Sequence, residues 1–408
     1  MAFRLEPDQR ARSRTVATRD LPAGSLVVSC HAITTVLIAE QKGKRCDTCH
    51  TKAAQLQRCS GCASYFYCSQ SCQTLQWNTH HRKICKCVAA RRFNNYTSSM
   101  PFQALAAHEK MDALLLSHLV AQLNGAEDSN PSIMDLLPGP AVTVPPIAYS
   151  SPSASELYSR FGNNNFVVHS HLETFAHGIF PLASRLFNHS CLPNAAAKYI
   201  LAPSKPPVME VVALRDIAAG EEICLPYLDP ALIQTRTQIF QLSYQFECRC
   251  DSCIFFEKVG PIPSPAPADR EQLVQKLMGL ESCELNPDSF PQELLPVFHE
   301  SFIAYLAETF RNASHDGAYQ IARTTGAALL NLYRLIYPPN YPQIGMHLLE
   351  LAKTCWNSFL SENNKDAEKE AESYLTDAKM ILGILGTEGD PDGPLTEIGT
   401  LETLLRGE

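Results

Sequence analysis

The sequence contains no uninterrupted run of about 18 apolar residues, the length that a membrane-spanning helix requires. Its first ten residues also lack the apolar core of a secretory signal peptide. We therefore expect neither a membrane span nor export, and we expect the protein in the nucleus, the cytoplasm or both. Charged residues are scarce, at 19%, but 45% of the 408 residues are hydrophobic. This is enough for roughly two to four globular domains, which excludes a small disulfide-held module.

Cysteine, in contrast, is abundant and clustered, with 16 residues in the chain. In a reducing compartment, clustered cysteines bind metal more often than they form disulfides. Two tetrahedral zinc ions need eight ligands. Free cysteines that pack as small apolar side chains would not recur in successive pairs. Two structural zinc sites are therefore predicted from eight ligands in four pairs, which are Cys46 and Cys49, Cys59 and Cys62, Cys68 and Cys72, and His81 and Cys85.

The histidine is the ambiguous ligand of this set. His80 competes with His81 for the eighth position. We prefer His81 because it precedes Cys85 by one helical turn, which puts both side chains on one helix face. Cys87 is left without a role. The segment has few aliphatic residues for a core of its own, so metal binding must supply much of its folding free energy.

The same segment is basic, although the whole chain carries a net charge of −8. Residues 41–92 contain ten Lys or Arg residues and a single acid, Asp47. A small basic lobe on an acidic body indicates an acidic partner, either nucleic acid or a negatively charged peptide. A solvated surface is the alternative. The zinc ligands use much of this lobe and no recognition helix is evident, so we do not expect it to bind DNA.

A second cluster, Cys248, Cys250 and Cys253, offers three thiolates and requires a distant fourth ligand. Cys191 is the strongest candidate because it lies in a polar loop, residues 188–194. A zinc ion there would clamp this loop against the chain that follows Tyr244. The alternative is an exposed, redox-sensitive cysteine triplet. The other candidates for the fourth ligand are Cys30, Cys87, Cys224, Cys283 and Cys355.

Outside the cysteine clusters, the pattern predicts a β unit interrupted by an insertion and followed by helices. The insertion contains helical spacing at residues 102–123 and a Pro/Ser-rich loop at 127–155. β-branched runs predict strands at residues 16–17, 26–28, 33–38, 166–168, 208–214 and 222–225, with a turn at 22–24. After a Pro-rich connector at 260–267, the 3.6-residue apolar period predicts helices at residues 272–280, 294–310, 318–336, 344–360 and 367–382.

Taken together, these segments resemble the SET and MYND domain (SMYD-type) protein lysine methyltransferases. Residues 46–85, with Tyr67, Gln73 and Trp77 in place, resemble a MYND zinc finger. Residues 188–194 resemble the SET asparagine-histidine motif, and residues 220–227 resemble its catalytic tyrosine strand. The cluster at 248–253 resembles the post-SET cluster, and residues 333–343 and 348–353 resemble the helical C-terminal domain of the family.

The resemblance implies an α+β multidomain fold. A MYND zinc finger would split the SET β-fold, and a post-SET zinc cluster and an all-α, TPR-like C-terminal domain would follow. No clean 34-residue repeat is present, so the TPR-like arrangement is carried by the helical pattern and the resemblance. The implied domains are the first SET part (1–45), the MYND finger (46–87), a helical SET insert with the Pro-rich loop (88–165), the second SET part (166–240), the post-SET segment (241–257) and the helical domain (258–408).

The same resemblance implies S-adenosylmethionine as the cofactor, a lysine side chain of a histone or other protein as the substrate, and three zinc ions. Tyr227 would be the active-site tyrosine, with Phe166 and Tyr244 lining the lysine channel. The third zinc ion would be held by Cys191, Cys248, Cys250 and Cys253. The residues implied to bind the cofactor are Asn188, His189, Asn164, Phe246 and Tyr227.

One segment departs from the family pattern. The family usually has a glycine-bearing turn near the amino terminus, whereas residues 12–18 (RSRTVAT) contain no glycine. A side chain at a position that needs close backbone approach has a cost, which gives a reason to expect weaker cofactor binding. A second hypothesis is therefore a catalytically weak or inactive adaptor for transcriptional regulation, which binds proline-rich peptides around Trp77 and recruits a partner through its helices. We expect a monomer.

Overall fold

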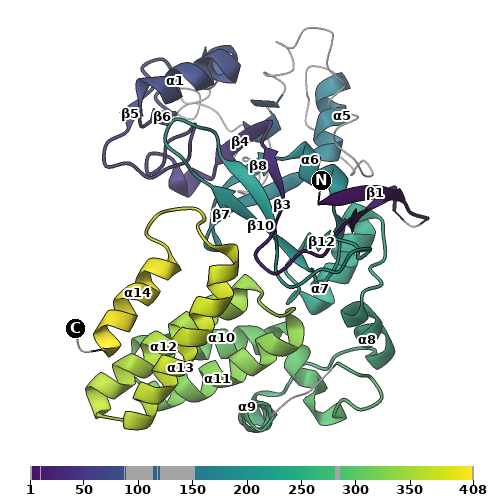
Figure 1. Cartoon of the computed structure of the whole chain (residues 1–408), viewed down its shortest axis with the longest axis vertical. Coiled ribbons are helices and arrows are strands. Elements are labelled where there is room, and N and C mark those ends of the chain that lie inside the picture. Colours follow the sequence, from purple (N-terminus) through teal and green to yellow (C-terminus); the bar gives the residue numbers. More distant parts are fainter. Residues whose placement is uncertain are drawn as a thin grey trace, which may run out of the picture.

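The computed structural model describes residues 2–9, 11–86, 88, 114–116, 118–119, 152–280 and 285–406. In this part of the chain, three bodies follow one another from top to bottom (Figure 1). We call them the cysteine lobe (residues 42–86), the β domain (residues 2–38 and 165–225) and the helical domain (residues 270–406). The predicted helix at 102–123 and loop at 127–155 lie largely outside the described residues. Within them, 114–116 and 118–119 are helical, and 152–155 begin helix α5 (Pro152–Phe161) rather than ending a loop.

The β domain is built from strands on both sides of the cysteine lobe in sequence. One three-stranded sheet has the order β10-β11-β3, and another has the order β4-β8-β7. Each sheet therefore pairs a strand that precedes the lobe with strands that follow it, which is the interrupted β unit predicted from the sequence. The strands of these sheets are β3 (Leu26–His31), β4 (Thr34–Leu37), β7 (Asn165–Ser170), β8 (Glu173–Ile179), β10 (Ala195–Ile200) and β11 (Val208–Ala213).

Two smaller pairs of strands complete the β domain. β1 (Phe3–Pro7) and β2 (Ser13–Ala17) form an antiparallel hairpin. β9 (Asn188–His189) runs parallel to β12 (Cys224–Leu225), with Asn188 opposite Cys224 and His189 opposite Leu225. This pairing brings the polar loop at 188–194 beside the predicted tyrosine strand. Helix α6 (Pro181–Leu186) immediately precedes β9.

The cysteine lobe has a small hydrogen-bonded framework. It contains β5 (Gln57–Arg58), β6 (Phe66–Tyr67), α1 (Gln70–Gln76) and a π-helical turn, η2 (Trp77–His81). Its buried cluster consists of six cysteines and two tyrosines, with only Leu56, Cys68, Ile84 and Val88 packed around them. This composition leaves the lobe without an aliphatic core, as the sequence predicted.

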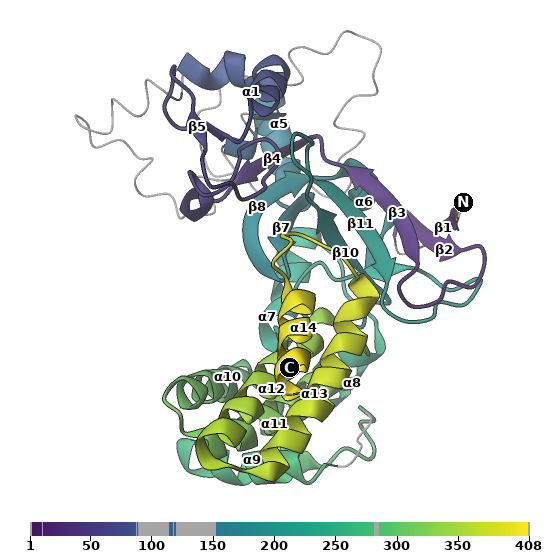
Figure 2. The same ribbon diagram turned by 60° about the vertical axis from the view of Figure 1, so that its left-hand side comes forward.

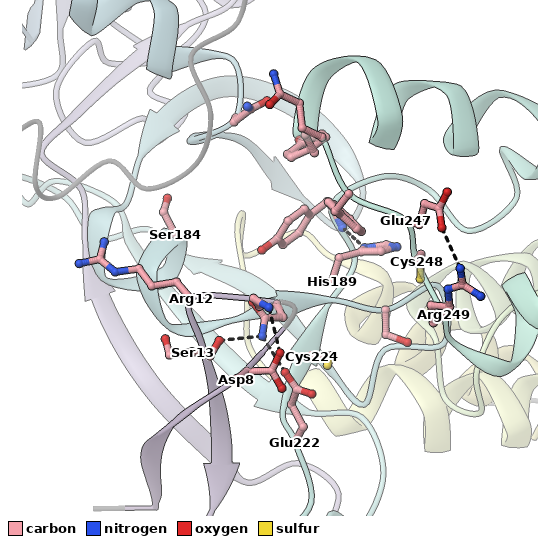
Figure 3. A pocket seen from close by; sticks show the side chains of 18 of the residues that line it. Asp8, Arg12, Ser13, Ser184, His189, Glu222, Cys224, Glu247, Cys248 and Arg249 are labelled. Atoms are coloured by element: carbon pink, nitrogen blue, oxygen red, sulfur yellow. Dashed lines mark hydrogen bonds and ion pairs between the residues drawn. The ribbon is translucent and has the colours of Figure 1, made fainter.

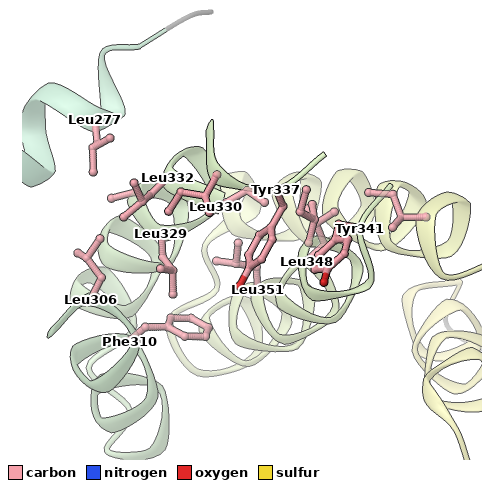
Figure 4. Packing of buried hydrophobic residues seen from close by; sticks show 14 of the residues in the cluster. Leu277, Leu306, Phe310, Leu329, Leu330, Leu332, Tyr337, Tyr341, Leu348 and Leu351 are labelled. Atoms are coloured by element: carbon pink, nitrogen blue, oxygen red, sulfur yellow. The ribbon is translucent and has the colours of Figure 1, made fainter. Parts of the chain in front are cut away.

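The helical domain has the largest core of the described chain, and leucines from several of its helices meet in it (Figure 4). Its elements are α9 (Arg270–Met278), η6 (Gln292–Phe298), α10 (Glu300–His315), α11 (Tyr319–Ile336), α12 (Pro342–Glu362), α13 (Lys365–Leu385) and α14 (Pro394–Leu405). Between the β domain and these helices lie α7 (Ile233–Ile239), the π-helical turn η4 (Phe240–Tyr244), α8 (Asp251–Val259) and η5 (Pro267–Asp269). The short η1 (Ala39–Gln41) instead joins the first part of the β domain to the cysteine lobe. No described helix is both long and apolar enough to cross a membrane.

The predicted helix at 294–310 is wrong as a single element. The chain forms the 3₁₀ segment η6, which contains Pro296, and then breaks at His299 before α10. Proline lacks the backbone N–H that a continuous α-helix needs, and the His299 side chain instead caps α10 by accepting a hydrogen bond from Ser301 N. The helices α7, α8 and α14 were not predicted.

The loop between α13 and α14 joins all three bodies, and we call it the clasp (residues 386–393). Figure 2 shows this loop reaching from the helical domain to β7 and β10. Gly389 N donates to Tyr199 O of β10 at 2.7 Å, and Asp390 N donates to Ser170 Oγ at the end of β7 at 2.9 Å. The Asp390 carboxylate also pairs with Arg45 of the cysteine lobe, where Arg45 Nη1 donates to Asp390 Oδ1 at 2.8 Å. The clasp therefore fixes the helical domain to the rest of the molecule.

Candidate functional site

Among the described residues, three groups of side chains have the composition and closeness of metal sites. Within each group, the potential ligand atoms all lie within 4.8 Å of one another. Soft thiolates with or without one imidazole, in sets of four, are the donors of structural zinc. The fit of these donor sets to zinc is therefore good. The groups are Cys46, Cys49, Cys68 and Cys72; Cys59, Cys62, His81 and Cys85; and Cys191, Cys248, Cys250 and Cys253.

His81, not His80, belongs to the second group. Its Nε2 lies 3.3 Å from Cys59 Sγ and 3.6 Å from Cys62 Sγ. The His80 ring instead stacks on His118, with centroids 4.2 Å apart, and its Nδ1 faces Thr79 Oγ1 at 3.2 Å. The sequence argument from the helical turn between His81 and Cys85 therefore selected the residue that the structure places in the group.

Cys191 is the distant partner of the third group. Its Sγ lies 3.5 Å from Cys253 Sγ and 4.0 Å from Cys248 Sγ. Of the other candidates, Cys30, Cys224 and Cys355 are in none of the three groups, and Cys87 and Cys283 lie outside the described residues. The third group therefore joins the loop at 188–194 to the segment behind Tyr244.

A cavity of about 640 Å³ opens beside this third group. Figure 3 shows its two opposite sides, with Arg12 and Ser13 from the amino-terminal hairpin on one and Glu247 and Arg249 on the other. His189 lies between them. The cavity is thus lined by segments that are far apart in sequence, and the third cysteine group joins two of them.

Asn188 is oriented by the protein before any ligand binds. Its Nδ2 donates to Ser13 O at 2.8 Å and to Glu222 Oε1 at 2.8 Å. Both amide hydrogens are therefore used, and Oδ1 remains as an acceptor on a residue that lines the cavity. Glu222 was not predicted as a site residue, although it lies within the tyrosine-strand motif.

His189 links the cavity to the third cysteine group. Its Nδ1 accepts a hydrogen bond from Tyr227 N at 3.0 Å, which leaves the proton on Nε2. Nε2 lies 3.2 Å from Cys191 Sγ and donates to it. Burial lowers the pKa of His189, so that its ring is neutral at physiological pH. Both ring nitrogens are thus engaged within the protein, and the ring orients Tyr227 and Cys191.

Aromatic rings form the inner wall of the cavity. The Tyr227 and Tyr244 rings have centroids 5.3 Å apart, and Phe246 stacks on Phe240 at 5.0 Å. The Tyr227 hydroxyl donates to Phe187 O at 2.7 Å. Burial raises the pKa of both tyrosines above the ordinary value, so each remains a neutral phenol at physiological pH.

A second cavity, of about 430 Å³, lies on the other side of these rings. It extends from Phe166 and Phe187 of the β domain to Tyr341 and Gln343 at the start of α12. The two cavities share four lining residues, which are Asn163, Ser184, Tyr227 and Tyr244. The shared residues make this wall the place where a ligand in one cavity meets a ligand in the other.

The predicted site residues lie on these two cavities. Asn164, Asn188, His189 and Phe246 line the first, Phe166 lines the second, and Tyr227 and Tyr244 line both. Ser184 was missed, although its buried Oγ has no hydrogen-bond partner in the described part of the chain. It precedes the Asn188 motif by four positions on a short helix, and no sequence pattern marked it.

The glycine-free turn forms one edge of the first cavity without an unusual backbone. Among the described residues 11–18, none has a positive φ angle. Ser13 lies in β2 and offers its carbonyl oxygen to Asn188. Glycine is therefore not needed for the conformation that this turn adopts.

The comparison with known protein families agrees with this geometry. The family model described as SET domain matches residues 15–228, which is more than half of the chain. The chain belongs to the SET domain family.

Several lysine methyltransferases of the SMYD type are similar to the chain. N-lysine methyltransferase SMYD2 of Gallus gallus is 26% identical over 314 residues, which cover 73% of this chain and 66% of that protein. Human SMYD2 is 27% identical over 260 residues, which cover 59% of this chain and 58% of that protein. Human histone-lysine N-methyltransferase SMYD3 is 24% identical over 370 residues, which cover 83% of this chain and 84% of that protein. The predicted SMYD-type family and α+β multidomain class are confirmed, although the chain spans less than two thirds of either of these SMYD2 proteins.

Proposed function

We propose that the protein is an S-adenosylmethionine-dependent protein lysine N-methyltransferase. The observation that carries this proposal is the pair of cavities that meet at Tyr227 and Tyr244. Transfer of a methyl group from a sulfonium to an amine is an in-line displacement, which requires donor and acceptor to approach from opposite sides. Two cavities with a shared aromatic wall provide these two approaches. The names of the SMYD relatives give the same activity.

The first cavity fits the cofactor in size and in chemistry. S-adenosylmethionine supplies an electrophilic methyl group when bound. Phe246 offers a ring face for an adenine, and the Asn188 Oδ1 acceptor suits an ammonium group. The glycine-free turn contributes Arg12 and Ser13 to the same cavity. Asn164 and His189 complete the predicted set, and we propose that His189 acts by orienting Tyr227 and the third cysteine group.

The second cavity fits a lysine side chain. Only the neutral amine can attack, and at physiological pH a lysine with a pKa of about 10.4 needs roughly 4 kcal/mol to become neutral. A channel walled by Phe166, Tyr227 and Tyr244 disfavours the charged form by desolvation, so no general base is required. The ring faces also hold the ammonium before it loses its proton. The alignment of the cofactor methyl group with the lysine amine then accounts for the rest of the rate acceleration.

We further propose that each cysteine group holds one structural zinc ion, three in all. The first two groups would form the MYND finger (46–87). This finger and the helical insert that follows it (88–165) would separate the two SET parts, 1–45 and 166–240. The third group would close the post-SET segment (241–257) before the helical domain (258–408). Closed sets of four ligands leave no open position on the metal, which fits a structural role.

The surroundings of the site support narrower proposals about partners. Trp77 on the cysteine lobe is 43% exposed, and its ring packs edge-on against His81 at 5.8 Å. An exposed indole on a rigid lobe suits a proline-rich peptide. We also propose a monomer that acts in the nucleus, the cytoplasm or both and does not bind DNA. Nothing in the described geometry favours the inactive adaptor, because the glycine-free turn still forms the cavity edge.

The proposal is tested by titration of the purified chain with S-adenosylmethionine. Asn188→Ala removes an acceptor for a charged group, and such hydrogen bonds contribute about 1.5–3 kcal/mol. We therefore expect saturable binding by the wild-type chain that is weakened about 10-fold to 100-fold in Asn188→Ala.

The matched control is Asn331→Ala, which removes the hydrogen bond from Asn331 Nδ2 to Leu277 O in the helical domain. This variant should bind the cofactor as the wild type does. A wild-type chain that shows no saturable binding would remove the basis of the proposal.

A further inference from the structure

Arg236 is a buried cation next to the third cysteine group. It lies in α7 and is 1% exposed. Its Nη2 donates to Ser252 Oγ at 2.9 Å, and its Nη1 donates to the carbonyl oxygen of Pro230. Its Nε has no hydrogen-bond partner among the described residues. Both of these hydrogen-bond partners are neutral oxygens, and no described carboxylate forms an ion pair with Arg236.

Such an environment is unfavourable unless a negative charge lies nearby. Arginine stays protonated at any physiological pH, so it cannot avoid the cost of burial by losing its proton. A buried charge without a counter-charge costs several kcal/mol. The negative charge therefore has to come from something other than a described Asp or Glu.

Glu247 and Glu257 line the same cavity as Arg236, but their exposed carboxylates pair with Arg249. The third cysteine group is then the source of negative charge beside Arg236. Ser252, which accepts from Arg236, stands between the ligands Cys250 and Cys253. Arg236 also lines a cavity of about 480 Å³ together with Cys248 and Cys253, and it interacts electrostatically with Cys191 and His189. Four thiolates around one Zn²⁺ ion carry a net charge of −2. In this group Cys191 is buried and the other three cysteines are half-buried, so a metal centre of charge −2 would lie beside the buried arginine.

We propose that Arg236 is the counter-charge of the Cys191, Cys248, Cys250 and Cys253 metal centre and thereby a positioning residue for the cofactor cavity. Helix α7 continues directly into η4, which ends at Tyr244. The charge pair therefore fixes the wall segment from both sides, through the ligands that follow Phe246 and through the helix that precedes it. The inference rests on the proposed function only in assuming that this centre holds zinc.

The test is zinc release from the full-length, zinc-loaded chain under competition with a chelator of known affinity. Arg236→Gln retains a hydrogen-bonding group but removes the charge, whereas Arg236→Lys retains the charge. We expect Arg236→Gln to release one zinc equivalent at a free-zinc concentration at least 10-fold higher than the wild type does. Arg236→Lys should stay within about 3-fold of the wild type. The remaining zinc should be released as in the wild type in both variants.

Three further measurements separate charge from packing. Ser252→Ala removes the hydrogen bond but not the charge, so its zinc release should match the wild type. Arg323→Met removes another largely buried arginine, which pairs with Glu370 in the helical domain, and should leave zinc release unchanged. With Co²⁺ in place of zinc, the thiolate-to-metal absorption band of Arg236→Gln should shift relative to that of Arg236→Lys.

Equal release by the Gln variant and the wild type would overturn the inference. It would also be overturned if Lys behaved like Gln, or if Ser252→Ala reproduced the effect. If Arg236→Gln does not fold, the Lys and Ser252→Ala variants decide, because the proposal requires both to release zinc as the wild type does. These readouts are independent of methyl transfer, so a chain that retains its zinc but lacks activity would contradict the proposed function alone.

Discussion

Replacement of Cys191 by alanine is expected to abolish the binding of S-adenosylmethionine by the full chain. Cys191 joins the loop that carries Asn188 and His189 to the ligands Cys248 and Cys253. Structural zinc in small domains supplies about 10–16 kcal/mol of folding free energy at neutral pH, so loss of one ligand leaves the surrounding segment unanchored. We expect cofactor affinity to fall more than about 100-fold and the zinc content to fall by one equivalent. Calorimetric titration and metal analysis measure the two quantities.

The control for this variant is Cys30→Ala, since Cys30 is another fully buried cysteine of the β domain and belongs to none of the three groups. It should lose stability through a small cavity but retain its zinc and its cofactor affinity. If Cys191→Ala kept full zinc content and wild-type affinity, the third centre would not support the cavity.

The second large effect is expected at the clasp. Asp390→Asn leaves the guanidinium of Arg45 buried without its carboxylate, with the Arg45 side chain only 1% exposed. Removal of one partner of a buried ion pair costs about 3–5 kcal/mol. The chain has two tryptophans, Trp77 in the cysteine lobe and Trp356 in α12, so urea unfolding followed by fluorescence reports on both bodies. We expect the urea midpoint to fall and the two tryptophans to report separate transitions.

The contribution of the Asp390 carboxylate to the free energy of unfolding should depend on pH. Burial alone would raise the pKa of Asp390, but the hydrogen bonds from Arg45 and Lys52 outweigh burial and lower it. A lowered folded pKa means that the contribution is present above the ordinary value of about 3.9 and is lost as the pH falls through the folded pKa. The difference between Asp390→Asn and the wild type should therefore be full at neutral pH and vanish in strong acid.

The exposed pair between Lys379 and Glu402 provides the matched control. Glu402→Gln should cost less than about 1 kcal/mol, because solvent screens an exposed pair. A loss in Asp390→Asn as small as that in Glu402→Gln would show that the clasp does not hold the bodies together.

Much of the candidate site could be predicted from the spacing of residues that lie close together in the sequence. The cysteine pairs and the turn between His81 and Cys85 identified the members of the first two groups, because the ligands of such sites lie close in sequence. The interleaving of the first two groups was not predictable, since any two of the four pairs have the composition of a zinc site. Cys191 could be selected because it lies in a short polar loop.

Contacts between residues that are far apart in the chain could not be predicted from the sequence. The clasp depends on Asp390 meeting Arg45, which is 345 positions away, and an isolated aspartate in a loop gives no signal of this partner. Ser184 and Glu222 likewise acquire a role only when α6 and β12 fold against the Asn188 loop. Arg236 was overlooked for the same reason, because its burial next to the cysteines follows from the packing of α7.

In the proposed function, the cavities joined at Tyr227 and Tyr244 bind a methyl donor and a lysine side chain. The most direct test is methyl transfer from labelled S-adenosylmethionine to a peptide library with central lysine and randomised flanking positions. A second library, with norleucine in place of the lysine, has a side chain of similar length without the amine. We predict label on the ε-amine of the lysine library, none on the norleucine library, and loss of the signal in Asn188→Ala. Equal labelling of both libraries, or none above the Asn188→Ala background, would contradict the account.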